Sequence, residues 1–178
     1  MTTPVWAGPF LVALLLLGAA SVLKLVHPAQ TAGALGAVGL PRSTVLVRAG
    51  AASELAVTGA AIGGSRLGAA LVAVSYLGFA SFVVVALRRR LPVGSCGCFG
   101  GVDTPPSLVH VVVDAGAAIS AGAAASARSM QAVPSMLNSQ PWHGVPFGLL
   151  VVATAGLAFI VLTDLARVLV SLGPRSRA

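Results

Sequence analysis

Charged side chains are scarce in this chain of 178 residues, where Asp, Glu, Lys and Arg together make up only 8% of the sequence. An ordinary soluble domain carries about 25% charged residues. Eleven basic and four acidic side chains are too few to form a water-facing surface around a chain of this length. The shortage therefore excludes a soluble globular enzyme and a disordered tail.

Aromatic residues are also few, at 5%, and they do not alternate with basic residues along any stretch. The formal net charge of +7 by itself is compatible with a nucleic-acid partner. The basic residues, however, stand between apolar runs and form no basic stripe, which a nucleic-acid interface requires. We expect membrane lipid, and no nucleic acid, to surround this protein.

Apolar sequence is abundant: 57% of the residues are apolar, and the mean hydropathy is +0.96. A transmembrane helix needs about 20 mostly apolar residues. The pattern predicts an all-α integral membrane helical bundle that forms a single domain over residues 1–178, with four to five spans. Five is the most economical count, at about 9–26, 44–64, 67–87, 107–127 and 145–170. Because no Lys or Arg precedes the first run, we expect a retained helix there and not a signal peptide.

The basic residues near the span ends predict an orientation. Cytoplasmic loops carry the excess of Lys and Arg. With the N-terminus outside, six arginines lie inside and two outside: Arg42, Arg88, Arg89, Arg90, Arg175 and Arg177 against Arg66 and Arg128. This count places the loop after the third span in the cytoplasm.

Only two cysteines occur, and one glycine separates them: Cys96 and Cys98 flank Gly97 in the Gly-rich segment 93–106. A disulfide between such neighbours requires a bent, strained backbone, which raises its reduction potential and which Gly97 makes accessible. The N-terminus of the fourth expected span follows closely and favours a thiolate. The pair predicts redox chemistry or binding of a soft metal ion.

Two ionisable residues, His110 and Asp114, lie four apart on the fourth expected span and therefore on one helix face. An imidazole oriented by the carboxylate could move a proton for the cysteine pair. The alternative is that both side chains only hold neighbouring helices together through polar contacts.

Other ionisable residues lie at membrane depth, where an unpaired charge is unfavourable. Glu54 is about 15 Å from the start of its span, too deep to reach water. It is either paired with a cation from a neighbouring helix or protonated. Lys24 and Arg48 lie near span ends and could extend to the interface. Asp164 and Arg167 are three apart and are expected to pair with each other.

Several of these residues together resemble the family of the methylamine-utilisation protein MauE, which is related to the DoxX-like membrane proteins. The resemblance covers roughly residues 10–114, and the Cys-Gly-Cys-Phe-Gly element is its specific part. It rests on Lys24, His27-Pro28, Gly39 to Pro41, Glu54-Leu55, Gly59, and Cys96-Gly97-Cys98-Phe99-Gly100.

The resemblance implies a multi-pass inner-membrane protein that supports maturation of a periplasmic, disulfide-rich subunit of methylamine dehydrogenase, together with a thioredoxin-like partner. Cys96 and Cys98 would be the redox pair, with Gly97, Phe99 and Gly100 shaping their loop. Lys24 and Glu54 would be the buried polar signature. MauE-like proteins also occur where no methylamine dehydrogenase exists, so the substrate does not transfer.

The resemblance conflicts with the charge count about the side on which the cysteines open. A pair that oxidises exported proteins belongs in an oxidising compartment, whereas the arginines place it inside. A cysteine pair just before the fourth span also resembles the vitamin K epoxide reductase architecture, in which the pair opens to the exported side and passes electrons to quinone. The compartment argument favours a periplasmic-facing site.

Two functions from different classes remain open. The first is a membrane thiol–disulfide oxidoreductase, a redox relay for an exported client protein, with a membrane quinone or a thioredoxin-like protein as the final electron carrier. The second is a non-enzymatic transport or assembly factor whose two thiolates bind a soft ion such as Cu(I). Zinc would need about four ligands, and besides the two cysteines only His27, His110 and His143 are available.

Overall fold

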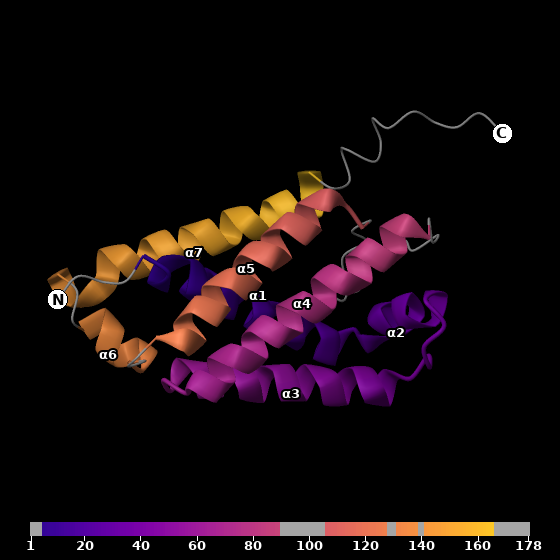
Figure 1. Cartoon of the computed structure of the whole chain (residues 1–178), viewed down its shortest axis with the longest axis horizontal. Helices are drawn as coiled ribbons and strands as arrows, with labels where there is room; N and C mark the ends of the chain where they lie inside the picture. The colour runs from indigo at the N-terminus through magenta and orange to yellow at the C-terminus, as the bar shows by residue number, and fades with distance from the viewer. Residues whose placement is uncertain (1–4, 90–105, 128–130, 139–140, 166–178) are drawn as a thin grey trace.

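The computed structural model describes residues 5–89, 106–127, 131–138 and 141–165, and every element in these ranges is helical (Figure 1). Five helices are long and apolar enough to cross a membrane. They are α1 (Ala7–Val26), α3 (Thr44–Ile62), α4 (Arg66–Arg88), α5 (Leu108–Ser126) and α7 (Val145–Ile160), the last continued by a π-helical turn, Val161–Leu165. The predicted all-α membrane bundle with five spans is confirmed.

The observed helices begin and end close to the predicted spans, and the boundaries have local physical causes. Ser43 and Ser65 precede α3 and α4, and their Oγ atoms accept hydrogen bonds from Leu46 N at 3.3 Å and Gly68 N at 3.1 Å. Both are N-caps that satisfy a free N–H at the helix start. Gly64, with φ +87°, makes the tight turn between the two helices. The predicted last span extends to residue 170, of which 166–170 lie outside the described residues.

Two shorter α-helices lie outside the spans: α2 (Pro28–Ala37) and α6 (Val133–Asn138). Helix α2 lies in the segment that connects the first two spans. Pro28 stands at the first helical position, where the missing N–H needs no partner. The helix packs against α3 and α1.

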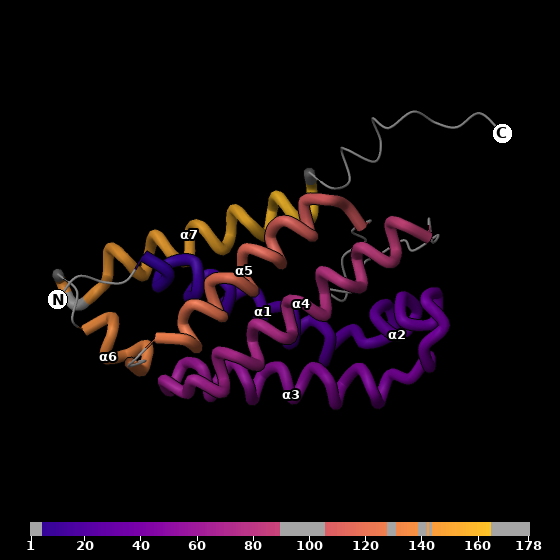
Figure 2. The backbone as a smooth tube through the Cα atoms, viewed as in Figure 1, coloured from indigo at the N-terminus to yellow at the C-terminus, as the bar shows by residue number. Residues whose placement is uncertain are grey.

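Helix α1 occupies the middle of the bundle and contacts α3, α5 and α7 (Figure 2). Its inward side chains, among them Phe10 and Leu17, are almost fully buried. The buried Tyr76 of α4 donates a hydrogen bond from its hydroxyl to Ala13 O at 2.6 Å, which joins α4 to α1. By contrast, large apolar side chains on the outer surface, such as Val112 and Ile119, are 70% and 73% exposed. Such an apolar exterior suits lipid.

Consecutive spans run in opposite directions, so that one end of the bundle collects α2, the C-terminal ends of α1, α4 and α7, and the first turns of α3 and α5 (Figure 1). We call this the α2 end of the bundle. The segment that connects α4 to α5 starts and finishes there.

Gly68 of α4 packs closely against the backbone of α3. A Cβ atom at this position would lie 2.6 Å from Ala61 N and 3.0 Å from Ala60 C, both backbone atoms that cannot move aside easily. We expect Gly68→Ala to destabilise the protein by about 1–3 kcal/mol, because overpacking shifts the backbone. Gly78→Ala on the same helix meets nothing within 4 Å and is the matched control. Unfolding by denaturing detergent measures both, and equal stability of the two variants would contradict the prediction.

Candidate functional site

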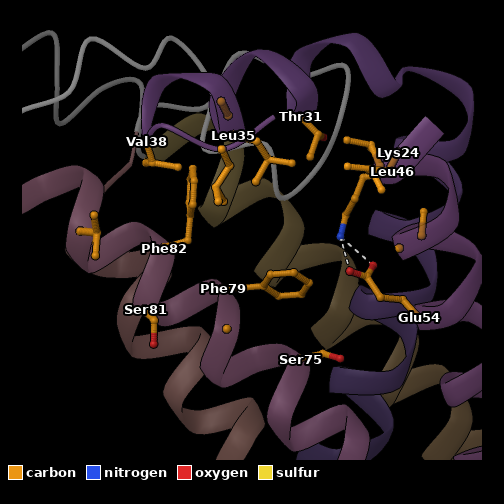
Figure 3. A pocket seen from close by; sticks show the side chains of 17 residues that line it. Lys24, Thr31, Leu35, Val38, Leu46, Glu54, Ser75, Phe79, Ser81 and Phe82 are labelled. Atoms are coloured by element: carbon orange, nitrogen blue, oxygen red, sulfur yellow. Dashed lines mark hydrogen bonds and ion pairs between the residues drawn. The ribbon is translucent and has the colours of Figure 1, made fainter. Parts of the chain in front are cut away.

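A buried ion pair joins α1 to α3. Lys24 Nζ donates hydrogen bonds to Glu54 Oε2 at 2.6 Å and Oε1 at 2.8 Å (Figure 3). Ser21 Oγ donates to the same Oε2 at 2.8 Å. The Lys24 side chain is only 5% exposed and that of Glu54 15%. The sequence left open whether Glu54 is paired with a cation or protonated. In the structure it is paired with the cation Lys24 from the neighbouring helix α1.

Of the two alternatives for Lys24, extension to the interface and burial beside Glu54, the structure has the second, since the side chain points into the bundle. Lys24 is three residues after Ser21, so both lie on the face of α1 that packs against α3. Glu54 is too deep to reach water, and a carboxylate at that depth needs a cation. Lys24 can supply this cation only when its side chain points into the bundle.

The same ammonium group also contacts α4. Lys24 Nζ lies 4.3 Å from the centroid of the Phe79 ring, a distance at which a cation is attracted to the ring face. Figure 3 shows Phe79 pointing from α4 toward the Lys24–Glu54 pair. One cluster of three side chains therefore connects α1, α3 and α4 at membrane depth.

A pocket of about 520 Å³ opens beside this cluster, between α1, α2, α3 and α4. Its wall is largely apolar, with Lys24 and Glu54 as its charged members. The remaining lining includes Thr31 and Leu35 from α2, Val47 from α3, and Phe79, Phe82 and Val85 from α4. We call this the α1–α4 pocket.

His110 and Asp114 are both buried in the first two turns of α5, at 2% and 8% exposure. His110 Nδ1 lies 2.9 Å from Ser107 Oγ at the start of the helix, so a hydroxyl group orients the imidazole. Within the part of the chain that the structure describes, Nε2 of this ring has no hydrogen-bond partner. A buried ring nitrogen in this state is available to accept or donate a proton.

Neither residue lines the α1–α4 pocket. The structure thus places the predicted site residues in two groups: Lys24 with Glu54, and His110 with Asp114. Both groups lie on helices that meet at the α2 end of the bundle.

The predicted cysteine site, comprising Cys96, Gly97, Cys98, Phe99 and Gly100, lies outside the described residues. Its place in the topology follows from its neighbours, because α4 ends at Arg88 and α5 begins at Leu108, both at the α2 end. Among the described residues, no group of three or more His, Cys, Asp or Glu side chains could hold a metal ion.

The predicted pair of Asp164 and Arg167 also extends beyond the described part of the chain. Asp164 is exposed in the π-helical turn after α7, and Arg167 lies outside the described residues.

Sequence reasoning did not identify Ser21, Phe79 or the pocket. A hydroxyl three residues before Lys24 in an otherwise apolar run was a usable signal for Ser21. The pocket left no such signal, because its wall is assembled from four helices that are distant in sequence.

The comparisons with known proteins agree with the sequence pattern. The family model described as "Methylamine utilisation protein MauE" matches residues 1–128, which is well over half of the chain. No curated protein and no solved structure matches the sequence.

Proposed function

The chain belongs to the MauE family of methylamine utilisation proteins, and from this premise we propose that it is a membrane thiol–disulfide redox relay. Its electrons would come from the cysteines of an exported client during that protein's maturation. Five apolar spans and the family make it a multi-pass membrane protein. The proposed relay activity is a finer claim than family membership, and it is argued from the cysteine pair and from the helix that follows it in the sequence.

The observation that carries the proposal is that the two cysteines of this chain shortly precede α5 in the sequence. Cys96 and Cys98 lie on the segment that leads into this helix, and the first turn of α5 buries His110. Its Nε2 has no partner among the described residues. A thiol becomes a nucleophile only as a thiolate, and therefore needs a nearby group that accepts its proton. His110 is suited to that role.

In the proposed reaction, a client thiolate attacks one sulfur of the Cys96–Cys98 disulfide and forms a mixed disulfide. The second client thiolate attacks the mixed disulfide and releases the relay as a dithiol. The client loses two electrons and two protons, and the cysteine pair gains them. In this scheme His110 takes up and returns a proton, and Asp114 lies one turn further along the same face of α5.

The reduced pair must then be reoxidised by an electron carrier, either a membrane quinone or a thioredoxin-like protein. Client oxidation belongs in an oxidising compartment, so the proposal places the cysteines on the outer face of the cell membrane. The Lys24–Glu54 pair has a structural role in this scheme, since it joins α1 to α3 near the end of the bundle where the cysteine segment is attached.

Thiol labelling in intact cells tests the proposal. We expect a membrane-impermeant maleimide to label the protein only after an impermeant reductant has been added, because an oxidised pair faces outward. The Cys96→Ser/Cys98→Ser double variant is the control, and it contains no other cysteine that could react. Labelling that needs cell lysis and no reductant would contradict the proposal. A stoichiometric soft metal in the purified protein would favour the transport or assembly function instead.

A further inference from the structure

The α1–α4 pocket has the features of a site for a lipid-soluble ligand. We propose that it binds a neutral carbonyl compound of the quinone class, with Lys24 Nζ donating a hydrogen bond to a carbonyl oxygen. Binding of the quinone does not depend on the proposed redox relay. Its role as the acceptor of the relay's electrons does rest on that proposed function.

The pocket has the size and the access that such a ligand needs. Its volume of about 520 Å³ lies within the range of known small-molecule sites, about 300–1,000 Å³. Leu40 and Leu46 belong to its lining and are 53% and 57% exposed, so they lie where the pocket meets the surface. Because exposed apolar side chains of a membrane bundle face lipid, the ligand would enter from the lipid phase.

The charges in the wall favour a ligand without net charge. Lys24 and Glu54 neutralise each other at 2.6 Å. A bound anion or cation would leave one charge uncompensated in an environment of low polarity, which is unfavourable. A neutral ligand leaves the pair intact.

The same pair supplies a hydrogen-bond donor. An ammonium group has three N–H donors and no acceptor. Two hydrogen bonds of Lys24 go to the two oxygens of Glu54. The third N–H can serve a carbonyl oxygen in the pocket, whereas a plain hydrocarbon chain has no such acceptor.

The shape of the wall suits a flat ring. Gly50 of α3 and Gly78 of α4 both line the pocket, and a Cβ atom at either position would meet nothing within 4 Å. The helices therefore present bare backbone at these two points. Phe82 lies on the same side of α4 as Gly78 and offers an aromatic surface against which a planar ring can stack.

Electrons and protons balance in the step that links the pocket to the relay. The Cys96–Cys98 dithiol forms an S–S bond and releases two electrons and two protons. The quinone takes up both electrons and both protons and leaves as the quinol, which is again neutral and lipid-soluble. The relay then starts its next turnover with a disulfide.

Equilibrium binding of a decyl-substituted benzoquinone to the full-length protein in lipid nanodiscs tests the pocket. We expect Gly50→Leu to weaken binding at least about tenfold, because the new side chain fills the space that the ring needs. Gly59→Leu is the matched control: it makes the same change on the same helix, also with nothing within 4 Å, and it does not line the pocket. We expect this variant to bind like the unchanged protein. Equal weakening in both variants, or in neither, would overturn the proposal.

Two further ligands test the chemistry of the site. Decane carries the chain without the carbonyl, and decanoate carries a negative charge at neutral pH. We expect both to bind at least about tenfold more weakly than the quinone, because each lacks either the acceptor or the neutrality. Binding of decane or decanoate as tight as that of the quinone would show a hydrocarbon-chain or anion site and overturn the proposal.

The Cys96→Ser/Cys98→Ser variant separates this inference from the proposed function. Quinone binding by that variant, together with oxidation of the thiols by quinone in the unchanged protein, supports both. Thiols that cycle without any quinone binding would overturn the inference alone. Quinone binding without oxidation of the thiols by quinone would overturn the quinone as the acceptor of the relay's electrons, and it would leave the pocket in place as a ligand site.

Discussion

Lys24→Met is expected to lower the free energy of unfolding by about 3–5 kcal/mol, the range found when one partner of a buried ion pair is removed. Methionine has nearly the length of lysine, so the variant creates little empty space. It leaves Glu54 at 15% side-chain exposure with Ser21 as its remaining described donor. An uncompensated carboxylate at membrane depth is the cause of the expected loss. Unfolding by denaturing detergent measures it.

The double variant Lys24→Met/Glu54→Met identifies that cause. With both charges removed, no unpaired ion remains, and we expect most of the lost stability to return. Arg48→Met is a control on α3, because it removes a basic side chain from an exposed position. A double variant as unstable as Lys24→Met would show that packing and not charge compensation makes Lys24 important.

Cys96→Ser and Cys98→Ser are each expected to abolish client oxidation, because a disulfide requires both sulfurs and a serine hydroxyl does not exchange with it. The protein itself should remain in the membrane in normal amounts, since the five spans do not depend on the cysteines. The yield of correctly disulfide-bonded client in cells that lack the chromosomal copy of the protein measures the effect. Full client oxidation by either variant would exclude the relay.

The two cysteine variants should differ from each other in one respect. The cysteine that the client attacks forms the mixed disulfide, and the other cysteine normally resolves it. When only the resolving cysteine is replaced, the covalent complex accumulates, whereas the reciprocal variant forms none. Gel analysis without reductant detects the complex, and the double serine variant is the control. A complex in neither variant would contradict attack through a mixed disulfide.

The match between predicted and observed spans has a simple physical basis. Burial in lipid requires about 20 apolar residues in each crossing, and every backbone N–H and C=O must be satisfied within the helix. Arg48 and Glu54 interrupt the α3 run, but the remaining residues are apolar enough for a helix that ends at Gly63-Gly64. Local composition was therefore sufficient for the spans.

The positions of side chains around a helix were less predictable. Lys24 lies close enough to a span end that both extension to the interface and an inward orientation were compatible with its place in the sequence. The choice depended on Glu54, which lies 30 residues away and contacts Lys24 only when α1 packs on α3. The helix α5 gives a second example. His110 and Asp114 were expected on one helix face, and both are buried. The imidazole of His110, however, lies within hydrogen-bond distance of the Ser107 hydroxyl, which was not identified from the sequence as its partner.

The amino-acid sequence by itself determined the class of protein, the five spans, the separation of the two cysteines and the family, because each of these depends on composition or on residues that are close in the chain. The tertiary structure decided which ionisable groups meet and where a ligand can enter. The ion pair requires two helices and the α1–α4 pocket requires four, and the packing of helices that are distant in sequence depends on the shapes of whole helix faces. No short stretch of sequence contains that information.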